Sequence, residues 1–351
     1  MAISSPTEVG GNNMHEKPIV ESEKSFLDHW IETEFNEQYE SQVRILHDLR
    51  LIEIFPGKDV MGIIGIDGKE YPVPTKQEII DEIKRDPEKY ETKMKQGFTK
   101  IQLTPFALPL ERLTMTLERT LLDHYKRKKL FAFKKNSSDP DKQLELNKKE
   151  PLLVSAGWVD DEKPIGLHGS DVTGKCVYHI ERFSETNHGG HTKAEILLAQ
   201  TGLNAQATSL FAGWEIKLLQ SPEIIPTASD SNVNGTMRPG LYTNPEHLLT
   251  ILKSDQQCAN EQGITNEDWL IQFLISLEQN NQVLDMMSVH YTRVACCIIG
   301  SYQPKIYCVG IGYWNEKENQ TCLYSTDIVN KIFASEVRTA VPVGPELNYP
   351  T

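Results

Sequence analysis

The most constraining stretch of the sequence runs from Thr265 to Val343, because it places one capped helix in front of several short strands. Thr265 with a carboxylate three residues later, at Asp268, is a pattern that begins a helix, and apolar residues then recur at helical spacing from Trp269. Short apolar runs separated by turn-forming residues follow, and the last of them covers residues 339–343. A helix followed by several short strands predicts an α+β fold for this part of the chain.

The N-terminal part is also predicted to mix helices with strands. Apolar residues recur at helical spacing over residues 22–46 and again over 109–129. Between them, an Asp-Gly pair supplies the tight turn of a hairpin over residues 61–73, and Thr75 with Glu78 repeats the helix-starting pattern.

A polar, charged segment separates these two apolar parts. The chain has 351 residues, which is long enough for two domains with a core each. We therefore predict an α+β protein with a helix-rich N-terminal domain and a mixed α+β C-terminal domain. The predicted boundaries are a flexible N-terminus over residues 1–20, a helix-rich α+β domain over 21–134, a linker over 135–150 and a mixed α+β domain over 151–345.

The balance of charges argues against a general nucleic-acid binder. The sequence contains 36 Lys and Arg against 49 Asp and Glu, a formal net charge of −13. Such a chain repels phosphate backbones unless its charges are segregated. One basic run, residues 126–129, is followed by Phe131 and Phe133 and could contact RNA or an acidic partner. Cations are also favoured at the C-terminus of a helix, and the sequence favours this structural role.

Other features predict a soluble, cytoplasmic protein. No run approaches the length of about 18 apolar residues that spans a membrane, and the N-terminus lacks a basic-then-apolar signal. Six cysteines, with Cys296 and Cys297 adjacent, fit reduced thiols better than a disulfide framework. The expected partners are an unknown protein or a small ligand, without membrane contact, and the oligomeric state is left open.

The segment with the most metal-like chemistry contains His188 and His191, joined by two glycines, and Glu195. If a helix begins near His191, then His191 and Glu195 lie four residues apart on one face, with His188 just before them. The main prediction is a chain without a cofactor. The alternative, which this set of residues supports, is that the chain binds one divalent metal such as zinc. In the other interpretation, a Gly-Gly turn enters a helix and the histidines bond loop backbone. The single spacing favours this second interpretation.

Several short motifs in the C-terminal part occur together. The first motif is a helix start with Thr265, an acidic residue at Asp268 and Trp269. A Gly-x-Tyr motif (Gly300 and Tyr302) and a Tyr-Trp pair (Tyr313 and Trp314) follow. The last motif is the Val-Arg-Thr-Ala-Val run from Val337 to Val341. This combination resembles C-type-lectin-like domains, above all the bacterial branch of formylglycine-generating-enzyme-like and variable ligand-binding proteins. The resemblance implies that fold for residues 265–343 and, by extension, for 151–345. The family's calcium-binding Glu-Pro-Asn triplet and paired catalytic cysteines have no match here.

The leading functional hypothesis is a binding or interaction protein that displays its ligand-binding surface on the C-terminal domain, and the sequence leans away from an enzyme. Exposed aromatic and amide side chains make efficient contacts, which selects Tyr302, Tyr307, Tyr313, Trp314 and Asn315 as the candidate surface. Packing in the core is the equally weighted alternative for these residues. Two rival hypotheses are a metal-dependent hydrolase or oxygenase that uses the histidine cluster, and an oligomeric scaffold that associates through the helix over residues 22–46.

Overall fold

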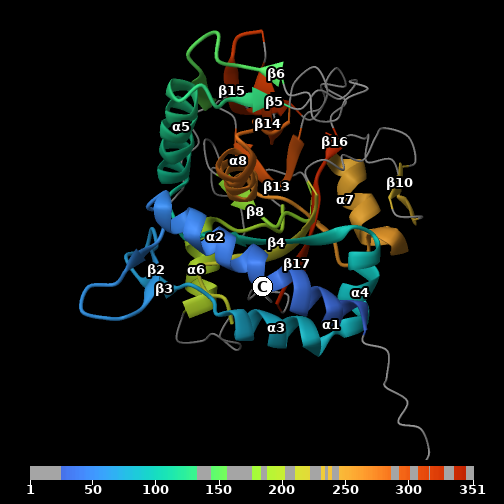
Figure 1. Ribbon diagram of the computed structural model, residues 1–351. Helices are drawn as coiled ribbons and strands as arrows, with labels where there is room; N and C mark the ends of the chain where they lie inside the picture. The colour runs from blue at the N-terminus through green and yellow to red at the C-terminus, as the bar shows by residue number, and fades with distance from the viewer. Residues whose placement is uncertain are drawn as a thin grey trace, which may run out of the picture.

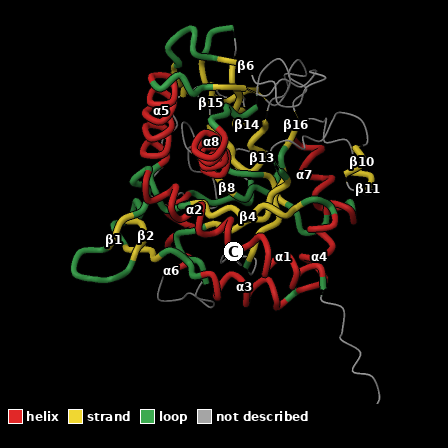
Figure 2. Tube along the Cα trace, viewed as in Figure 1, coloured by secondary structure: helices red, strands yellow, loops and turns green. Residues whose placement is uncertain are grey.

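The computed structural model shows an α+β fold in which helices cover a set of antiparallel and mixed sheets (Figures 1 and 2). Among the described residues, no helix combines the length and the apolar character needed to cross a membrane. The structure describes residues 25–132, 144–155, 176–182, 188–201, 210–221, 231–233, 236–238, 245–285, 292–300, 307–315, 317–327 and 336–344.

The helix predicted over residues 22–46 is confirmed as a continuous rod with a π-helical turn inside it. Its parts are α1 (Phe26–Trp30), the π-helical turn (Ile31–Phe35) and α2 (Asn36–Asp48). The Ser25 hydroxyl caps the start by accepting a hydrogen bond from the Asp28 backbone N–H at 3.1 Å.

The predicted hairpin and the helix after it are also confirmed. Strands β1 (Glu53–Ile54), β2 (Met61–Ile64) and β3 (Glu70–Pro72) form an antiparallel sheet. Gly68 closes the β2–β3 turn at φ +74°, which a side chain would disfavour. Thr75 and Glu78 form the expected capping box of α3 (Lys76–Arg85), and α4 (Pro87–Lys95) follows from an Asp86 cap.

The central sheet takes strands from both sides of the predicted linker. Its order is β12 (Gln262–Gly263), β17 (Thr339–Val343), β9 (Glu215–Gln220) and β4 (Phe98–Thr104), all antiparallel. One continuous set of buried side chains likewise runs from Leu27 to Val343. The segments predicted as separate domains therefore share a sheet and a core.

The predicted linker itself holds a short strand. Within it, β6 (Leu144–Glu145) pairs with β5 (Phe131–Ala132). This pairing ties residues 144–149 to the end of α5 (Leu110–Lys126), the helix predicted over 109–129.

A second sheet contains most of the short strands predicted near the C-terminus. Its order is β16 (Glu336–Val337), β13 (Thr292–Gly300), β14 (Tyr307–Asn315), β15 (Gln320–Asp327) and β7 (Leu152–Ser155), and β8 (Cys176–Tyr178) also pairs with β13. The remaining elements are α6 (Lys193–Thr201), the hairpin β10 (Ser231–Val233) and β11 (Thr236–Arg238), α7 (Pro245–Ser254) and a 3-10 turn (Gln256–Cys258).

Helix α8 (Asn266–Asn280) lies in the interior between these layers and beside α5 (Figure 1). Every residue from Asn266 to Leu274 is buried, so this part of the helix is enclosed on all sides. Thr265 and Asp268 form its capping box, as the sequence predicts, but both side chains of the box are also fully buried. The polar start of this buried helix holds charged side chains that lead to a cleft at one end of the central sheet.

Candidate ligand-binding cleft

Of the three metal-ligating residues predicted from the sequence, His188 and Glu195 use their side chains to accept backbone hydrogen bonds. The Nδ1 atom of His188 accepts a hydrogen bond from the Gly190 N–H at 2.9 Å, and His191 pairs through its backbone with Tyr178. Glu195 accepts from the Thr192 N–H at 2.8 Å and so caps α6. No group of three His, Cys, Asp or Glu side chains within the described ranges is arranged to hold a metal ion. Metal binding stays a prediction.

Burial keeps these histidines neutral. Desolvation lowers the pKa of His188, and it lowers the pKa of His191 to about 4 with help from the nearby charges of His179 and His188.

The predicted aromatic surface is divided by the structure. Tyr313 and Trp314 are buried, which is the core-packing alternative for these two side chains. Asn315 accepts hydrogen bonds from the N–H groups of Lys317 and Glu318 and so closes the β14–β15 turn. Tyr302 lies outside the described residues, and Tyr307 is placed on β14 by its backbone.

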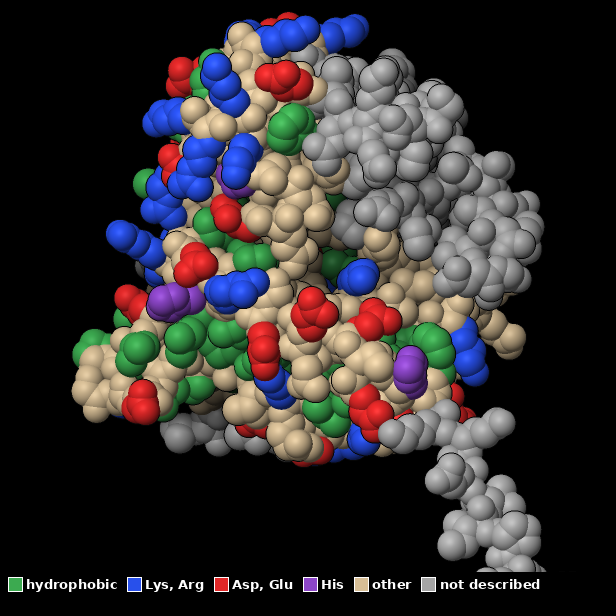
Figure 3. Space-filling view, viewed as in Figure 1, with side chains coloured by type: hydrophobic (Ala, Val, Ile, Leu, Met, Phe, Trp, Pro, Cys, Tyr) green, Lys and Arg blue, Asp and Glu red, His purple; other side chains and the backbone are tan. Residues whose placement is uncertain are grey.

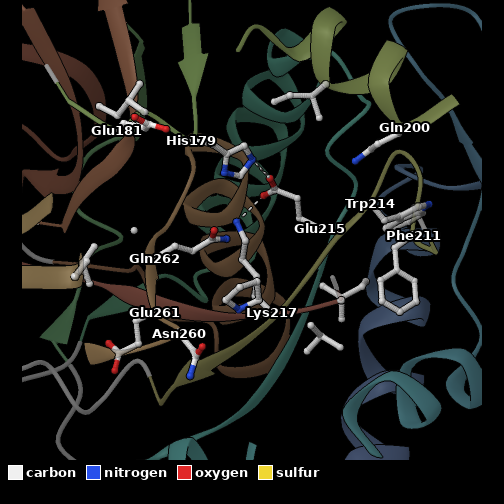
Figure 4. A pocket seen from close by; sticks show the side chains of 18 of the residues that line it. His179, Glu181, Gln200, Phe211, Trp214, Glu215, Lys217, Asn260, Glu261 and Gln262 are labelled. Carbon is white, nitrogen blue, oxygen red and sulfur yellow. Dashed lines mark hydrogen bonds and ion pairs between the residues drawn. The ribbon is translucent and has the colours of Figure 1, made fainter. Parts of the chain in front are cut away.

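A cleft of about 520 Å³ lies elsewhere, at one end of the central sheet. Strand β9 and the loop after β8 form one side of the cleft, and α6, α7, β12 and the end of β17 complete it. Figure 4 shows His179, Glu215 and Lys217 in a row at its centre, with Phe211 and Trp214 to one side. The volume lies within the range of about 300–1,000 Å³ that small-molecule sites occupy.

The row of charges continues from the cleft into the interior. His179 Nε2 lies 3.3 Å from Glu215 Oε1, and Lys217 Nζ lies 2.5 Å from Glu215 Oε2. Lys217 also donates to the buried carboxylate of Asp268. Burial alone raises the pKa of the Glu215 carboxyl, but the Lys217 ammonium and the His179 hydrogen bond outweigh burial and lower the pKa to about 2. Glu215 is therefore an ionised carboxylate at neutral pH.

Each member of the row is held by local structure. Glu215 and Lys217 are two residues apart on β9, so both point to the same face of the sheet. Asp268 is fixed by the start of α8, where it accepts from the Thr265 N–H at 2.8 Å and the Thr104 hydroxyl at 2.7 Å.

His179 is held in an unusual backbone conformation. Its φ is +55°, a left-handed value that few residues with a Cβ adopt, and such strain collects at functional sites. The loop opposite can approach because Gly190 has no side chain: a Cβ there would come within 2.6 Å of the Tyr178 carbonyl oxygen.

Two further buried ion pairs stand near the cleft. Lys193 Nζ lies 2.9 Å from Glu267 Oε1, and the Tyr178 hydroxyl donates to the same oxygen at 2.7 Å. Lys93 Nζ lies 2.7 Å from Glu261 Oε1, a residue that lines the cleft. The Thr339 hydroxyl donates to the other oxygen of Glu261 at 2.7 Å.

Apolar side chains form the rest of the lining. They come from α6, from the turn before β9, from α7 and from the end of β17, and they include Ile196, Phe211, Trp214, Leu249, Leu252 and Val343. A mostly apolar wall with a few fixed polar groups is the usual composition of a ligand pocket.

Comparisons of the chain with protein-family models, with curated proteins and with solved structures find no match. The interpretation of the cleft therefore depends on its own geometry.

Proposed function

We propose that this chain is a binding protein that holds a small ligand in the cleft between β9, α6 and α7. The observation that carries the proposal is the row His179–Glu215–Lys217–Asp268, which leads from the cleft to the buried start of α8. This row gives the mostly apolar cleft the few fixed polar groups that a ligand pocket usually has. Fixed polar groups favour binding because little side-chain freedom is lost when a ligand enters.

The charges of the lining point to a ligand without net charge. Three lysines, three glutamates and one histidine line the cleft: Lys89, Lys217, Lys253, Glu181, Glu215, Glu261 and His179. Because positive and negative groups balance, a strongly charged ligand gains little attraction there. A ligand that has separate hydrogen-bond donors and acceptors as well as an apolar part could contact both the charged row and the apolar lining of the cleft. Nucleosides, sugars and zwitterionic amino acids have this chemistry.

The C-type-lectin-like resemblance of residues 265–343 is in keeping with a binding role. That family implies a scaffold that presents a ligand surface, and we propose the cleft as the place where this chain does so. Pro342 and Val343 at the end of β17 line the cleft and belong to the segment that carries the resemblance. The start of α8 belongs to it too and holds one lining residue, Lys217, through Asp268.

Saturation-transfer NMR with a panel of nucleosides, monosaccharides and amino acids tests the proposal. Each compound is paired with its phosphorylated analogue, and the uncharged or zwitterionic member is expected to give the stronger signal. Leu252→Trp fills the cleft from α7 and is expected to remove the signal.

The matched control is Leu198→Trp, because Leu198 is 57% exposed on α6 and does not line the cleft. This variant is expected to bind like the unmodified chain. The proposal fails if no compound gives a signal that Leu252→Trp removes and Leu198→Trp preserves.

A further inference from the structure

A basic patch lies apart from the cleft, and we propose that it binds an acidic segment of a partner protein. Its members are exposed cations from three segments of the chain that are distant in sequence. We define the basic patch as Lys126, Arg127, Lys128, Lys129, Lys148, Lys149 and Lys317.

Backbone hydrogen bonds bring the first two segments together. Helix α5 ends in a tight turn in which the Lys128 N–H donates to the Tyr125 carbonyl at 2.9 Å, with Lys128 at φ +56°. Two residues further on, Leu130 is buried, and its carbonyl accepts a hydrogen bond from the Leu146 N–H at 2.9 Å. The Leu130 N–H donates to Asn147 Oδ1 at 3.1 Å. Residues 126–129 therefore lie beside the segment that carries Lys148 and Lys149.

The third segment is the turn between β14 and β15. Lys149 Nζ donates to the Glu318 carbonyl oxygen at 3.3 Å, and the Asn319 side chain donates to the Lys149 carbonyl. These contacts place Lys317 at the same end of the molecule. In Figure 3, lysine and arginine side chains gather along the side occupied by α5 and along the upper edge.

A purely structural role explains only part of this patch. Cations next to the last turn of α5 meet the negative end of the helix dipole, but that effect fades within one turn and does not involve Lys148 or Lys317. Lys126, Lys128, Lys129 and Lys148 have no carboxylate within 4.0 Å among the described residues, and Lys149 is 3.9 Å from Glu318.

Several surface lysines outside the patch do have a carboxylate partner. Lys84 lies 3.1 Å from Asp28, and Lys58 and Lys76 pair with Glu70 and Glu40. Four of the seven cations in the basic patch, Lys126, Lys128, Lys129 and Lys148, lack a carboxylate partner among the described residues. On a chain of net charge −13, this is a concentration of positive charge that an acidic partner would neutralise.

The composition of the patch favours a protein partner over a nucleic acid. It contains six lysines and one arginine, whereas arginine is the residue that grips phosphate with two parallel hydrogen bonds. Exposed carboxylates, Glu145 and Glu318 among them, interrupt the patch and would repel a continuous phosphate track. Phe131 is half-buried with its backbone in β5, so it is no open platform for stacked bases.

Fluorescence anisotropy with two labelled probes tests the proposal on the full chain. The probes are an oligoglutamate peptide and a single-stranded oligouridylate with the same number of charges. We expect the peptide to bind more tightly and its affinity to fall as salt is raised. Replacing Lys126, Arg127, Lys128 and Lys129 together by Gln is expected to weaken peptide binding about tenfold or more.

The control variant replaces Lys58, Lys76, Lys84 and Lys95 by Gln, which removes the same charge from three exposed lysines and one half-buried lysine, Lys76, outside the patch. It is expected to bind the peptide within about twofold of the unmodified chain, because distant exposed charges are screened. A second variant, with Arg in place of Lys126, Lys128 and Lys129, keeps the charge and is expected to keep the affinity. Tighter binding of oligouridylate, equal losses in both Gln variants, or no peptide binding would each overturn the proposal.

Discussion

Two regions of the interior are equally buried but are built in opposite ways. Beneath α2 and α5, most buried side chains are apolar, with Ile45, Leu113 and Leu117 as examples, and the few polar ones are uncharged or histidine. At the start of α8, beside the cleft, the buried side chains include Lys193, Lys217, Glu267 and Asp268. The first region is stabilised by removing apolar surface from water, and the second depends on every charge keeping its partner. Substitutions should therefore act differently in the two regions.

The largest effect is expected from breaking the row of charges. Lys217→Met removes the ammonium that separates Glu215 from Asp268 and leaves two buried carboxylates facing each other. We expect a loss of about 3–5 kcal/mol in the free energy of unfolding, measured by urea denaturation.

Lys58→Met is the matched control, since Lys58 pairs with Glu70 on the surface. This variant should lose about 0–1 kcal/mol in the free energy of unfolding. If both variants lose the same free energy of unfolding, the buried row of charges contributes no more to stability than a surface ion pair.

A slightly smaller loss is expected in the apolar region. Leu117→Ala removes a fully buried side chain from α5 and should cost about 3 kcal/mol in the same experiment, through lost burial and the cavity left behind. Met115→Ala on the same helix, where Met115 is 61% exposed, should cost less than about 0.5 kcal/mol. A similar cost at both positions would contradict the assigned core face of α5.

The pH dependence separates the two regions further. The pKa of Glu215 is about 2 in the folded chain against an ordinary 4.5, so its ionised form stabilises the fold above pH 4.5, and this stability is lost as pH falls from 4.5 toward 2. We expect the stability difference between the unmodified chain and Glu215→Gln to shrink over that window. Urea unfolding of both proteins at several pH values measures it. A difference that does not change with pH would show that the carboxylate is not held ionised.

The same contrast explains what could be predicted from the sequence. The helices over α2, α3, α5 and α8 and the β2–β3 hairpin follow from apolar periodicity, capping pairs and an Asp-Gly turn, all of which are local signals. The central sheet was not predicted, because β4 pairs with β9 and β9 with β17 across more than a hundred residues.

The cleft was missed for a related reason. Lys193 and Lys217 look like exposed residues in any sequence pattern, and their burial depends on carboxylates supplied by α8. Glu215 and Lys217 at alternating positions of a strand were the available signal for a shared face. The sequence around His179 gives no comparable signal, because a left-handed backbone at a residue with a Cβ is not a local sequence pattern.

The two capping boxes offer the finest test of the contrast between buried and exposed polar groups. The hydroxyls of Thr265 and Thr75 each accept the backbone N–H three residues on, at 3.1 and 3.3 Å, but Thr265 is fully buried and Thr75 is exposed. Thr75→Ala should cost about 1 kcal/mol, because water can replace the lost hydroxyl. Thr265→Ala should cost about 2 kcal/mol, since the N–H of Asp268 would be left without a partner in the interior. Thr265→Ser, which keeps the hydroxyl, should recover most of that loss. Equal costs at the two helices, measured by urea unfolding, would mean that burial adds nothing to the cap of α8 and that the charged interior beneath the cleft is open to water.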